Sequence, residues 1–308
     1  FNGLQSYNMS SALEYYIPGY SESSYPMIVG LILAVGTGLI IFGGVHRIGF
    51  ITSVMVPIMA GAYLLMGLFT IVTHLPQLPG IFAMILSEAF DFQAIFGGMA
   101  GSAVVIGIKR GLFSNEAGMG SAPNAAASAS VSHPAKQGMV QVISVFIDTL
   151  LICSATAMML LLSGVQGEAG VLDGIPFVQK AISANVGTWG IHFITASIFA
   201  FAFSSLIGNY YYAESNILFI KNNKVLLFVF RCTCLLAVFL GAQADFSLVW
   251  NLADITMGCM AIVNIIAILL LGNIALKVLK DYETQKKAGK NPVFKAENVG
   301  IKNTDCWK

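Results

Sequence analysis

Residues 110–123 read Arg110-Gly111-Leu112-Phe113-Ser114-Asn115-Glu116-Ala117-Gly118-Met119-Gly120-Ser121-Ala122-Pro123. This stretch is polar, charged and rich in glycine, whereas the residues before and after it form long apolar runs. An apolar run of about 18 residues or more can cross a lipid bilayer as a helix. The contrast predicts an all-α integral membrane protein, a helix bundle in which residues 110–123 lie at a membrane surface.

The composition of the whole chain favours a membrane protein. Of its 308 residues, 56 % are hydrophobic and 10 % are charged, whereas a soluble domain carries about 25 % charged residues. The formal net charge of +1 gives no electrostatic reason to expect a nucleic-acid partner. The five cysteines have no spacing typical of a metal or redox site, so we expect no cofactor there. The chain begins at Phe1 in polar sequence without a signal peptide, which predicts a fragment or a processed piece.

The apolar runs predict seven membrane spans. They cover residues 26–45, 50–73, 91–109, 138–164, 190–219, 225–242 and 247–276, with ends accurate to a few residues. Residues 1–25 are predicted as an extracellular or periplasmic loop, residues 26–276 as a transmembrane bundle and residues 277–308 as a basic cytoplasmic tail. We expect this tail to be solvated and disordered. The connections around residues 76–91 and 173–189 are predicted as polar loops.

Positive charges predict how the spans are oriented. They occur in the tail and in alternate connections, whereas the other connections contain only Lys180. The residues in the alternate connections are Arg47, Lys109, Arg110, Lys136, Lys221 and Lys224. Positive residues favour the cytoplasmic side of a membrane. The N-terminus is therefore predicted outside the cell membrane, with the tail and residues 110–123 on the cytoplasmic side.

A glycine cluster stands in the middle of the third span, where Gly97, Gly98 and Gly101 fall within five residues. Each glycine weakens a helix by about 1 kcal/mol relative to alanine. Local unwinding here would free backbone N–H and C=O groups in mid-membrane, and discontinuous helices of this kind form substrate and ion sites in secondary transporters. Close helix packing through small residues explains the cluster equally well.

Polar groups in four further spans need a reason, because they are costly in lipid. Ser204 and Ser205 in the fifth span offer hard oxygen ligands suited to a sodium ion, although serines also bond back to their own helix. Asp148, deep inside the fourth span, can help to hold a cation or fix a helix, whereas Asp254 in the seventh is more readily structural. Arg231 stands near one end of the sixth span and can snorkel to the surface.

Residues 110–123 contain two candidates for an inner gate, Asn115 and Glu116, and Asp148 is a candidate for fixing a helix near it. Glu116 can pair with Lys109 or Arg110, cap the next helix or belong to the gate. No nucleophile elbow or metal spacing supports catalysis by Ser114, Glu116 and His133. A membrane-embedded enzyme with Asp148 and Asp254 as an acid–base pair is a minor alternative.

Longer motifs run through most of the predicted spans. The longest is residues 107–123, in which Gly107-Ile108-Lys109 precede the stretch quoted first. The others are His133-Pro134 with Gln137-Gly138, Val145-Phe146-Ile147-Asp148-Thr149 with Cys153 and Thr156-Ala157, Ser204-Ser205-Leu206-Ile207-Gly208 with Tyr212 and Glu214, and Asn251-Leu252-Ala253-Asp254 with Asn264. With these motifs the chain closely resembles the sodium:alanine symporter family, the alanine or glycine:cation symporters.

The resemblance implies a fold of the leucine-transporter type, within the amino acid–polyamine–organocation superfamily. That fold has two inverted five-helix repeats, whose first and sixth helices are broken at the substrate. By order and orientation, the seven spans would match the fourth to tenth core helices, so the bundle is expected to be incomplete. The third span would be the broken sixth helix, and the fifth span would be the eighth helix, which completes a sodium site.

The resemblance also implies site residues. The substrate-binding residues would be Gly97, Gly98, Met99, Gly101, Ser102 and Asn209, and the sodium-binding residues would be Phe201, Ser204 and Ser205. Many relatives have Phe at the position of Met99 and Trp at the position of Asn209, which leaves side-chain selectivity open. Sodium, as the coupling ion, is the only metal expected.

The function that the resemblance implies is secondary active transport, in which a small neutral amino acid, alanine or glycine, crosses the cell membrane together with sodium. The choice between these amino acids, proton coupling and the oligomeric state are left open. Because the first three core helices are absent, the chain by itself is not expected to transport. An inactive truncated product is the alternative, and no enzyme activity is expected.

Overall fold

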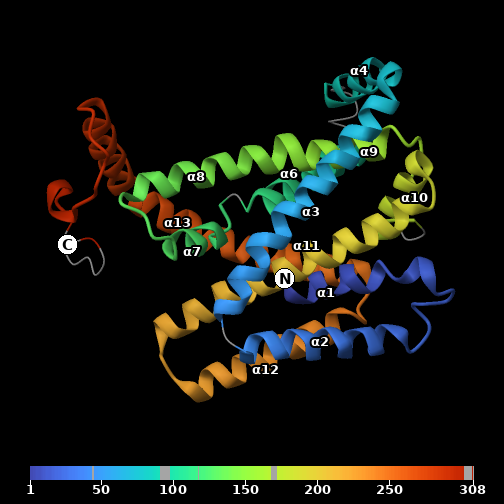
Figure 1. Ribbon diagram of the computed structural model, residues 1–308, viewed down its shortest axis with the longest axis horizontal. Coiled ribbons are helices and arrows are strands. Elements are labelled where there is room, and N and C mark those ends of the chain that lie inside the picture. Colours follow the sequence, from blue (N-terminus) through green and yellow to red (C-terminus); the bar gives the residue numbers. More distant parts are fainter. Residues whose placement is uncertain (44, 91–97, 117, 168–171, 302–306, 308) are drawn as a thin grey trace. The chain divides into compact units, whose positions relative to one another are not determined.

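The computed structural model describes residues 1–43, 45–90, 98–116, 118–167, 172–301 and 307, and the side chains of all of these except residues 45–53 and 98–103. Every secondary-structure element in these ranges is a helix (Figure 1). The α-helices are α1 (Asn2–Ser11), α2 (Tyr25–Gly43), α3 (Val45–Thr73), α4 (Leu78–Ala89), α6 (Gly98–Asn115), α7 (Ser121–Ala127), α8 (Pro134–Ile147), α9 (Ser154–Leu161), α10 (Gly174–Val186), α11 (Trp189–Ile220), α12 (Lys224–Gly241) and α13 (Phe246–Lys287). A π-helix, η3 (Asp148–Cys153), joins α8 to α9, and η1 (Glu14–Tyr16), η2 (Leu75–Gln77) and η4 (Ala296–Val299) are 3-10 helices.

Six helices in the described ranges are long and apolar enough to cross a membrane. They are Tyr25–Gly43, Val54–Thr73, Pro134–Leu161, Trp189–Ile220, Lys224–Gly241 and Phe246–Lys287. They match six of the seven predicted spans, and the chain therefore has the make-up of a multi-pass membrane helix bundle. The predicted third span, residues 91–109, begins outside the described residues and continues in α6.

Contacts between helices divide the chain into two compact units. The first unit consists of Phe1–Val104 and Leu151–Asp254, and it contains α1 to α4 and α9 to α12. The second unit consists of Val105–Leu150 and Ile255–Lys308, and it contains α7, α8 and most of α6 and α13.

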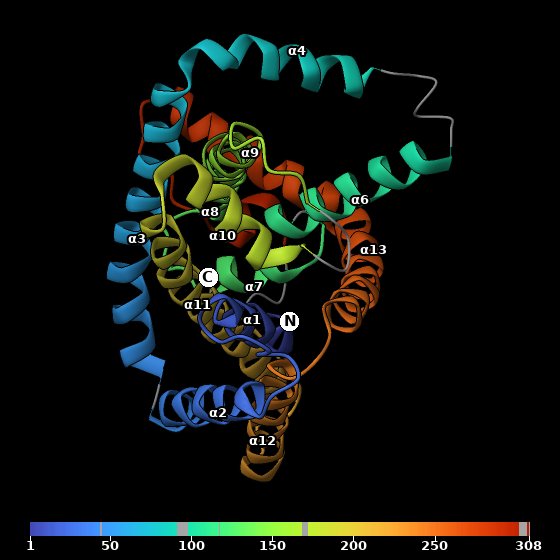
Figure 2. The same ribbon diagram turned by 90° about the vertical axis from the view of Figure 1, so that its right-hand side faces the viewer.

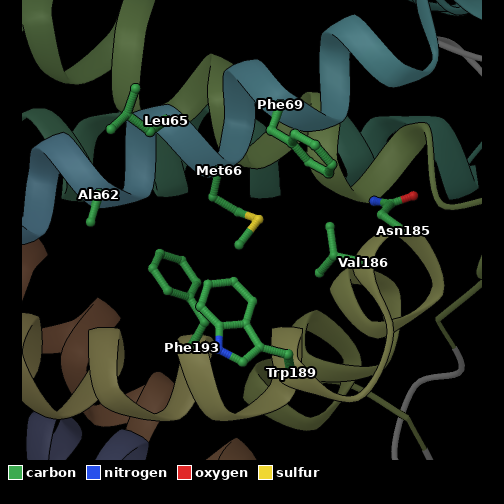
Figure 3. Close-up of a pocket in the computed structure, with 8 residues that line it drawn as sticks. All are labelled: Ala62, Leu65, Met66, Phe69, Asn185, Val186, Trp189 and Phe193. Atoms are coloured by element: carbon green, nitrogen blue, oxygen red, sulfur yellow. The ribbon is translucent and has the colours of Figure 1, made fainter.

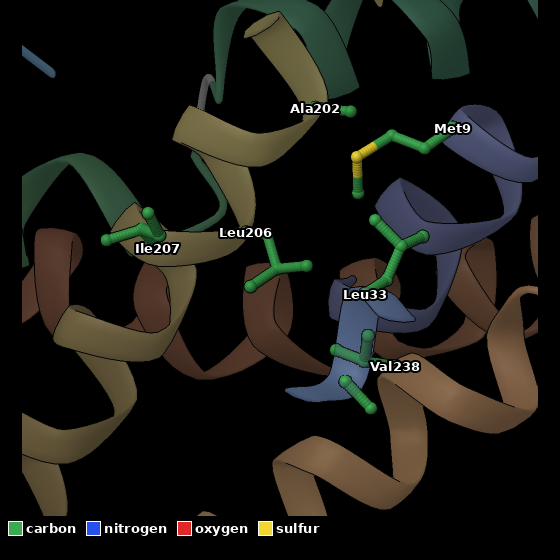
Figure 4. Close-up of a cluster of buried hydrophobic side chains, with 7 residues drawn as sticks. Met9, Leu33, Ala202, Leu206, Ile207 and Val238 are labelled. Carbon is green, nitrogen blue, oxygen red and sulfur yellow. The ribbon is translucent and has the colours of Figure 1, made fainter. Parts of the chain in front are cut away.

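Helix α11 is the centre of the first unit, where it contacts α1, α3, α10 and α12 (Figure 2). One apolar cluster joins Leu206 of α11 to Met9 of α1, Leu33 of α2 and Val238 of α12 (Figure 4). A second cluster packs another part of α11 against α3, α9 and α10 and consists of Tyr63, Met66, Met159, Ile182 and Ile194. Because α11 is packed along much of its length, the serines that it carries lie on a well-supported element.

Glycines allow the helices of the first unit to approach one another closely. A Cβ atom placed on Gly241, at the end of α12, would overlap the backbone of Gly3 in α1. A Cβ on Gly30 would lie 2.8 Å from the carbonyl oxygen of Phe239. Small residues at such crossings let helix backbones meet, which is a common way of packing helices in membranes.

Two connections that were predicted as polar loops are largely helical. Helix α4 occupies residues 78–89 and α10 occupies residues 174–186. Pro79 and Pro176 stand in the first turns of these helices, where a missing N–H costs no hydrogen bond, so they start the helices instead of breaking them. In α10, Ala181 and Ile182 are fully buried. The prediction of irregular loops was wrong in these two places.

The segment predicted as an outside loop, residues 1–25, contains helix α1 and packs against the rest of the first unit. Ser10 donates a hydrogen bond from Oγ to the carbonyl oxygen of Ala242 at 2.8 Å. Gln179 of α10 donates from Nε2 to the carbonyl oxygen of Ala12 and to Thr195 Oγ1, both at 2.9 Å. Residues 1–25 are therefore ordered, and their position outside the cell stays a prediction.

Burial perturbs two acidic groups in this segment. The pKa of the Glu14 carboxyl is raised above its ordinary value of 4.5 by partial burial and by the nearby carboxylate of Asp173. Burial also raises the pKa of Tyr7 to about 12. Because folding disfavours the ionised form of Glu14, this residue contributes stability below its ordinary pKa, and the contribution is lost as the pH rises through its raised pKa.

Replacing Glu14 by Gln should remove this loss of stability. We expect Glu14→Gln to raise the thermal unfolding midpoint slightly at neutral pH and to flatten the decrease in stability between pH 4.5 and neutrality. Glu22→Gln, at an exposed carboxylate in the same segment, is the control. Identical unfolding midpoints for wild type and Glu14→Gln across this range would contradict the prediction.

Arg231 is half-buried and is bonded to two buried side chains of α11. Its Nη2 lies 2.8 Å from Glu214 Oε1, and its Nε donates to the hydroxyl of Tyr210 at 2.9 Å. The guanidinium also stands over the ring of Phe42, 5.2 Å from the centroid. A carboxylate on α11 therefore pairs with the charge of Arg231, a partner that the sequence analysis did not identify.

The first part of the predicted disordered tail is folded. Helix α13 continues to Lys287, and after it Phe294 and Ala296 are 5 % and 2 % exposed. The backbone N–H of Phe294 donates to the carbonyl oxygen of Ser132 at 2.9 Å. The prediction of disorder was wrong for residues 277–301, because Phe294 packs against His133 in the segment before α8.

Candidate functional site

Helix α6 ends in a corner built from left-handed backbone. Glu116 has a φ of 51°, and Gly118 and Gly120 have φ values of 75° and 93°. Glycine adopts such angles at no steric cost, whereas other residues do so rarely and at a cost in energy. The glycines of the stretch quoted first therefore make the turn into α7, and Glu116, a predicted gate residue, carries backbone strain within it.

Two side-chain amides hold this corner in the second unit. Asn264 of α13 donates from Nδ2 to the carbonyl oxygen of Gly118 at 3.0 Å, and Asn124 donates to that of Gly120 at 3.0 Å. A Cβ atom on Gly120 would lie 3.1 Å from the Cβ of Asn264. The sequence pattern placed Asn264 in a motif but did not reveal that it supports the corner from α13.

A polar junction joins the end of α6 to the middle of the long helical run that starts with α8. Ser114 donates from Oγ to Asp148 Oδ2 at 2.6 Å, and Thr149 donates from Oγ1 to Asn115 Oδ1 at 2.7 Å. The junction falls where the run changes to the π-helix Asp148–Cys153. Single π-helical turns inside α-helices are rare and occur frequently at functional sites.

The junction brings together Asn115 and Asp148, both of which the sequence singled out. Their partners, Ser114 and Thr149, were not among the predicted site residues. Each partner is adjacent in sequence to a predicted residue, so two neighbouring polar pairs, 114–115 and 148–149, were the available signal. The pairing between them depends on the approach of two helices 34 residues apart, which no local pattern reveals.

The predicted substrate segment falls at the start of α6. Gly97 lies outside the described residues, and Gly98, Met99, Gly101 and Ser102 are helical, in the first turns of α6. Local unwinding is therefore absent from residue 98 onward. A break in the helix before Gly98 would fall outside the described residues and stays a prediction.

Helix α11 carries the residues predicted to bind sodium, Phe201, Ser204 and Ser205. Ser204 donates from Oγ to the carbonyl oxygen of Phe201 at 2.9 Å, which is the back-bonding that competes with ion binding. Ser205 is exposed and Asn209 is half-buried in the chain. The role of these residues in sodium binding stays a prediction.

The ring of Phe201 packs against α3, which is in turn hydrogen-bonded to α9. Its ring meets that of Tyr63 edge to face, with centroids 5.8 Å apart. The hydroxyl of Tyr63 is hydrogen-bonded to Thr156 Oγ1 at 2.8 Å. In the described part of the chain, no group of three or more His, Cys, Asp or Glu side chains is arranged to hold a metal ion.

A cavity of about 780 Å³ in the first unit lies apart from the predicted site residues. Its lining is apolar except for Asn185 (Figure 3), whose amide nitrogen already donates to the carbonyl oxygen of Met159. The other lining residues are Ala62, Leu65, Met66, Phe69, Val186, Trp189 and Phe193. Because a charged amino acid needs several polar partners, this cavity is a poor site for one.

The chain is similar to bacterial carriers along its whole length. It is 46 % identical to the amino-acid carrier protein AlsT of Bacillus subtilis and 45 % identical to the probable sodium/glutamine symporter GlnT of the same organism, in both cases over 100 % of the chain. It covers 65 % of the first protein and 63 % of the second. The sodium/proton-dependent alanine carrier protein of Bacillus sp. (strain PS3) is 38 % identical over 92 % of the chain, and the chain covers 67 % of that protein.

The chain thus spans about two thirds of the length of these relatives, which are named as carriers and symporters. A family model described as the sodium:alanine symporter family matches residues 1–296. That family consists of transporters and not of enzymes, which removes the acid–base pair of Asp148 and Asp254 as an alternative. The chain belongs to the sodium:alanine symporter family.

Proposed function

We propose that this protein is a secondary active transporter that carries a small neutral amino acid, alanine or glycine, across the cell membrane together with a sodium ion. The observation that carries this proposal is the similarity of the entire chain to cation-coupled amino-acid carriers. Because the chain spans about two thirds of their length, the proposal concerns the activity of the whole protein.

For the fold, we propose the leucine-transporter type with the spans of this chain as core helices four to ten. The helix α6, which contains Gly98 and Gly101 and ends at the left-handed corner, would be the inner part of the broken sixth helix. The six membrane-capable helices and the order of the motifs support this assignment.

For the substrate, we propose Gly97, Gly98, Met99, Gly101, Ser102 and Asn209 as the binding residues. An amino acid carries a carboxylate and an ammonium group, which need partners of opposite charge in mid-membrane. In the proposed broken helix, the first N–H groups of its inner part would favour a carboxylate, because the N-terminus of a helix carries partial positive charge. Small residues there leave room for the ligand beside the backbone.

For the coupling ion, we propose that Phe201, Ser204 and Ser205 bind sodium through the Phe201 carbonyl oxygen and the two hydroxyl oxygens. The bond between Ser204 and Phe201 already brings two of these three oxygens within 2.9 Å. An ion would compete with the hydroxyl hydrogen for the carbonyl oxygen. Sodium bound next to the substrate would favour the loaded state, and the coupling between the two ligands must be reciprocal.

For the inner gate, we propose Asn115, Glu116 and Asp148 at the cytoplasmic end of a moving helix. The strained corner and the two hydrogen bonds of the α6–α8 junction support this role. With the orientation that the positive charges predict, we propose that residues 1–25 lie outside the cell, residues 26–276 in the membrane and residues 277–308 in the cytoplasm.

The experiment that tests the proposal is uptake of labelled alanine by cells that express the full-length protein. Uptake should require an inward sodium or proton gradient, and competition by unlabelled alanine, glycine and glutamine should rank the substrates. Glutamine belongs in the series because one relative is named a probable sodium/glutamine symporter. Uptake that persists after both ion gradients are removed would exclude symport.

Replacing Ser204 and Ser205 together by Ala should raise the sodium concentration for half-maximal uptake by roughly tenfold or more, because two oxygen ligands worth about 1 kcal/mol each are lost. Membrane insertion should be unchanged. Ser215→Ala is the matched control, since Ser215 is exposed on the same helix and bonds only back to Tyr211 at 2.8 Å. An unchanged sodium activation curve for the double variant would remove the serines from the ion site.

A further inference from the structure

The folded part of the tail forms a clasp, which we define as residues 288–301 packed against Ser132–Lys136 and the last turns of α13. Its anchor on the bundle is His133, which is fully buried. The backbone N–H of Ala135 donates to His133 Nδ1 at 3.1 Å, so the hydrogen on Nε2 points toward Asp281 Oδ2 at 3.3 Å. The rings of Tyr282 and Phe294 both meet the imidazole edge to face, with centroids 5.2 Å away.

Hydrogen bonds hold the clasp on two sides. On the side of α8, Lys136 Nζ donates to Asn291 Oδ1 at 2.7 Å, and Ser132 Oγ donates to the carbonyl oxygen of Pro292 at 3.0 Å. On the side of α13, Gln285 donates from Nε2 to the carbonyl oxygen of Val293 and accepts from its N–H, both at 3.0 Å. The clasp is thus tied to both helices.

The clasp runs back along α13. The chain reverses at Gly289, whose φ is 73°. Val293 then lies beside Gln285, and Phe294 lies against His133, which is bonded to Asp281. Pro292, Phe294 and Ala296 are buried, whereas the residues between them are exposed, the alternation of an extended segment on a surface.

Lysines dominate the outward side of this structure. Between residues 277 and 301 there are six lysines and three carboxylates, and Asp281 is engaged by His133 and Gln285. All six lysines are exposed: Lys277, Lys280, Lys286, Lys287, Lys290 and Lys295. None of the three carboxylates lies next to the reversal, where Lys286, Lys287 and Lys290 are closest together in sequence.

The clasp keeps these charges close to the membrane end of α13. Lys277 is the first charged residue after the apolar part of that helix. The helix extends about 15 Å over the ten residue steps from Lys277 to Lys287, at 1.5 Å per step, and the clasp then returns instead of continuing outward. Attraction to a charged bilayer surface falls off within a Debye length, about 8–10 Å at physiological salt. A free tail would spread the same lysines over a longer distance.

We propose that the clasp presents these lysines to anionic phospholipid headgroups of the membrane that α13 crosses. Clusters of four to eight basic residues directly beyond a membrane helix bind anionic lipid surfaces through charge. The binding surface is the exposed lysine side of residues 277–295, and the clasp determines its distance from the bilayer. This inference rests on the membrane-spanning α13 and not on the proposed transport activity.

The experiment is amine-reactive footprinting of the full-length protein in nanodiscs, read by mass spectrometry for each lysine. One set of nanodiscs contains phosphatidylcholine, and the other contains phosphatidylcholine with phosphatidylglycerol. We expect Lys277, Lys280 and Lys295 to react at least fivefold more slowly in the anionic nanodiscs, since each lysine near the surface contributes about fivefold to binding. High salt should restore the rates, and Lys180, exposed on α10, is the internal reference.

Two variants separate charge from geometry. Phe294→Asn keeps all charges but removes the apolar anchor, and it should abolish the protection of Lys295. Glu283→Gln with Glu297→Gln removes two exposed carboxylates and should increase the protection. Equal rates in both lipids, equal slowing at Lys180, or full protection in Phe294→Asn would overturn the proposal. Protection by added RNA in neutral nanodiscs but not by phosphatidylglycerol would identify a different partner and also overturn it.

Discussion

Replacing Asp148 by Ala is expected to reduce the initial rate of amino-acid uptake by the full-length protein at least tenfold. The substitution removes the acceptor for Ser114 Oγ at 2.6 Å, at the place where α8 turns into the π-helix. A hydrogen bond to a charged group contributes about 1.5–3 kcal/mol, which corresponds to roughly a ten- to hundredfold effect. If the junction fixes the inner end of α6 during transport, its loss affects the rate more than the amount of protein in the membrane.

The controls for Asp148→Ala follow from the hydrogen bonds of the junction. Asp148→Asn keeps an acceptor oxygen and should be milder than Asp148→Ala. Ser114→Ala should add little to Asp148→Ala, because contacting residues are not additive. Ser144→Ala should have no effect, since Ser144 is exposed on the same helix and bonds only back to Gln141 at 2.7 Å. Normal uptake by Asp148→Ala at normal expression would show that the junction has no role in transport.

Replacing Gly241 by Ala is expected to destabilise the first unit by at least about 3 kcal/mol, the upper end of the cost of overpacking a well-packed site. The added Cβ would overlap backbone atoms of Gly3, and backbone cannot rotate away as a flexible side chain can. Helix α1 would have to move off α12, which would also break the bond from Ser10 Oγ to the carbonyl oxygen of Ala242.

The matched control for this variant is Gly36→Ala. A Cβ on Gly36, inside α2, would meet no atom within 4 Å, and alanine favours a helix over glycine by about 1 kcal/mol. Detergent-solubilised Gly241→Ala should therefore unfold at a lower temperature than wild type, and Gly36→Ala at the same or a higher temperature. Equal unfolding temperatures for Gly241→Ala and wild type would contradict the close crossing of α1 and α12.

The membrane spans could be predicted from the sequence because hydropathy over about 20 residues is a local property. The helices α4 and α10 could not be predicted from hydropathy, since each of them is short and contains polar residues. Helix α10 is buried through contacts that are distant in sequence or lie on another helix. Gln179, for example, donates hydrogen bonds to the carbonyl oxygen of Ala12 and to Thr195 Oγ1. The clasp could not be predicted either, because Phe294 is buried through contact with His133, a residue distant in sequence.

The candidate site divides in a similar way. Asp148 stood out because an isolated polar group in apolar sequence needs a partner, and Asn115 because it stands in the polar stretch 110–123; the structure supplies partners for both. Which partners they find depends on the distance between two helices. The depth of Arg231 in its span indicated only that its side chain can reach the surface. The structure adds its partner, because Arg231 Nη2 lies 2.8 Å from Glu214 Oε1. The substrate and sodium residues stay predictions.

Alanine-driven sodium uptake tests the central claim, coupled symport, most directly. The purified full-length protein is reconstituted in liposomes with equal sodium inside and outside and no membrane potential, and alanine is then added outside. Because coupling between two ligands is reciprocal, the inward alanine gradient should drive labelled sodium into the liposomes, and protein-free liposomes should show no such uptake. Alanine entry without any movement of sodium would contradict the account.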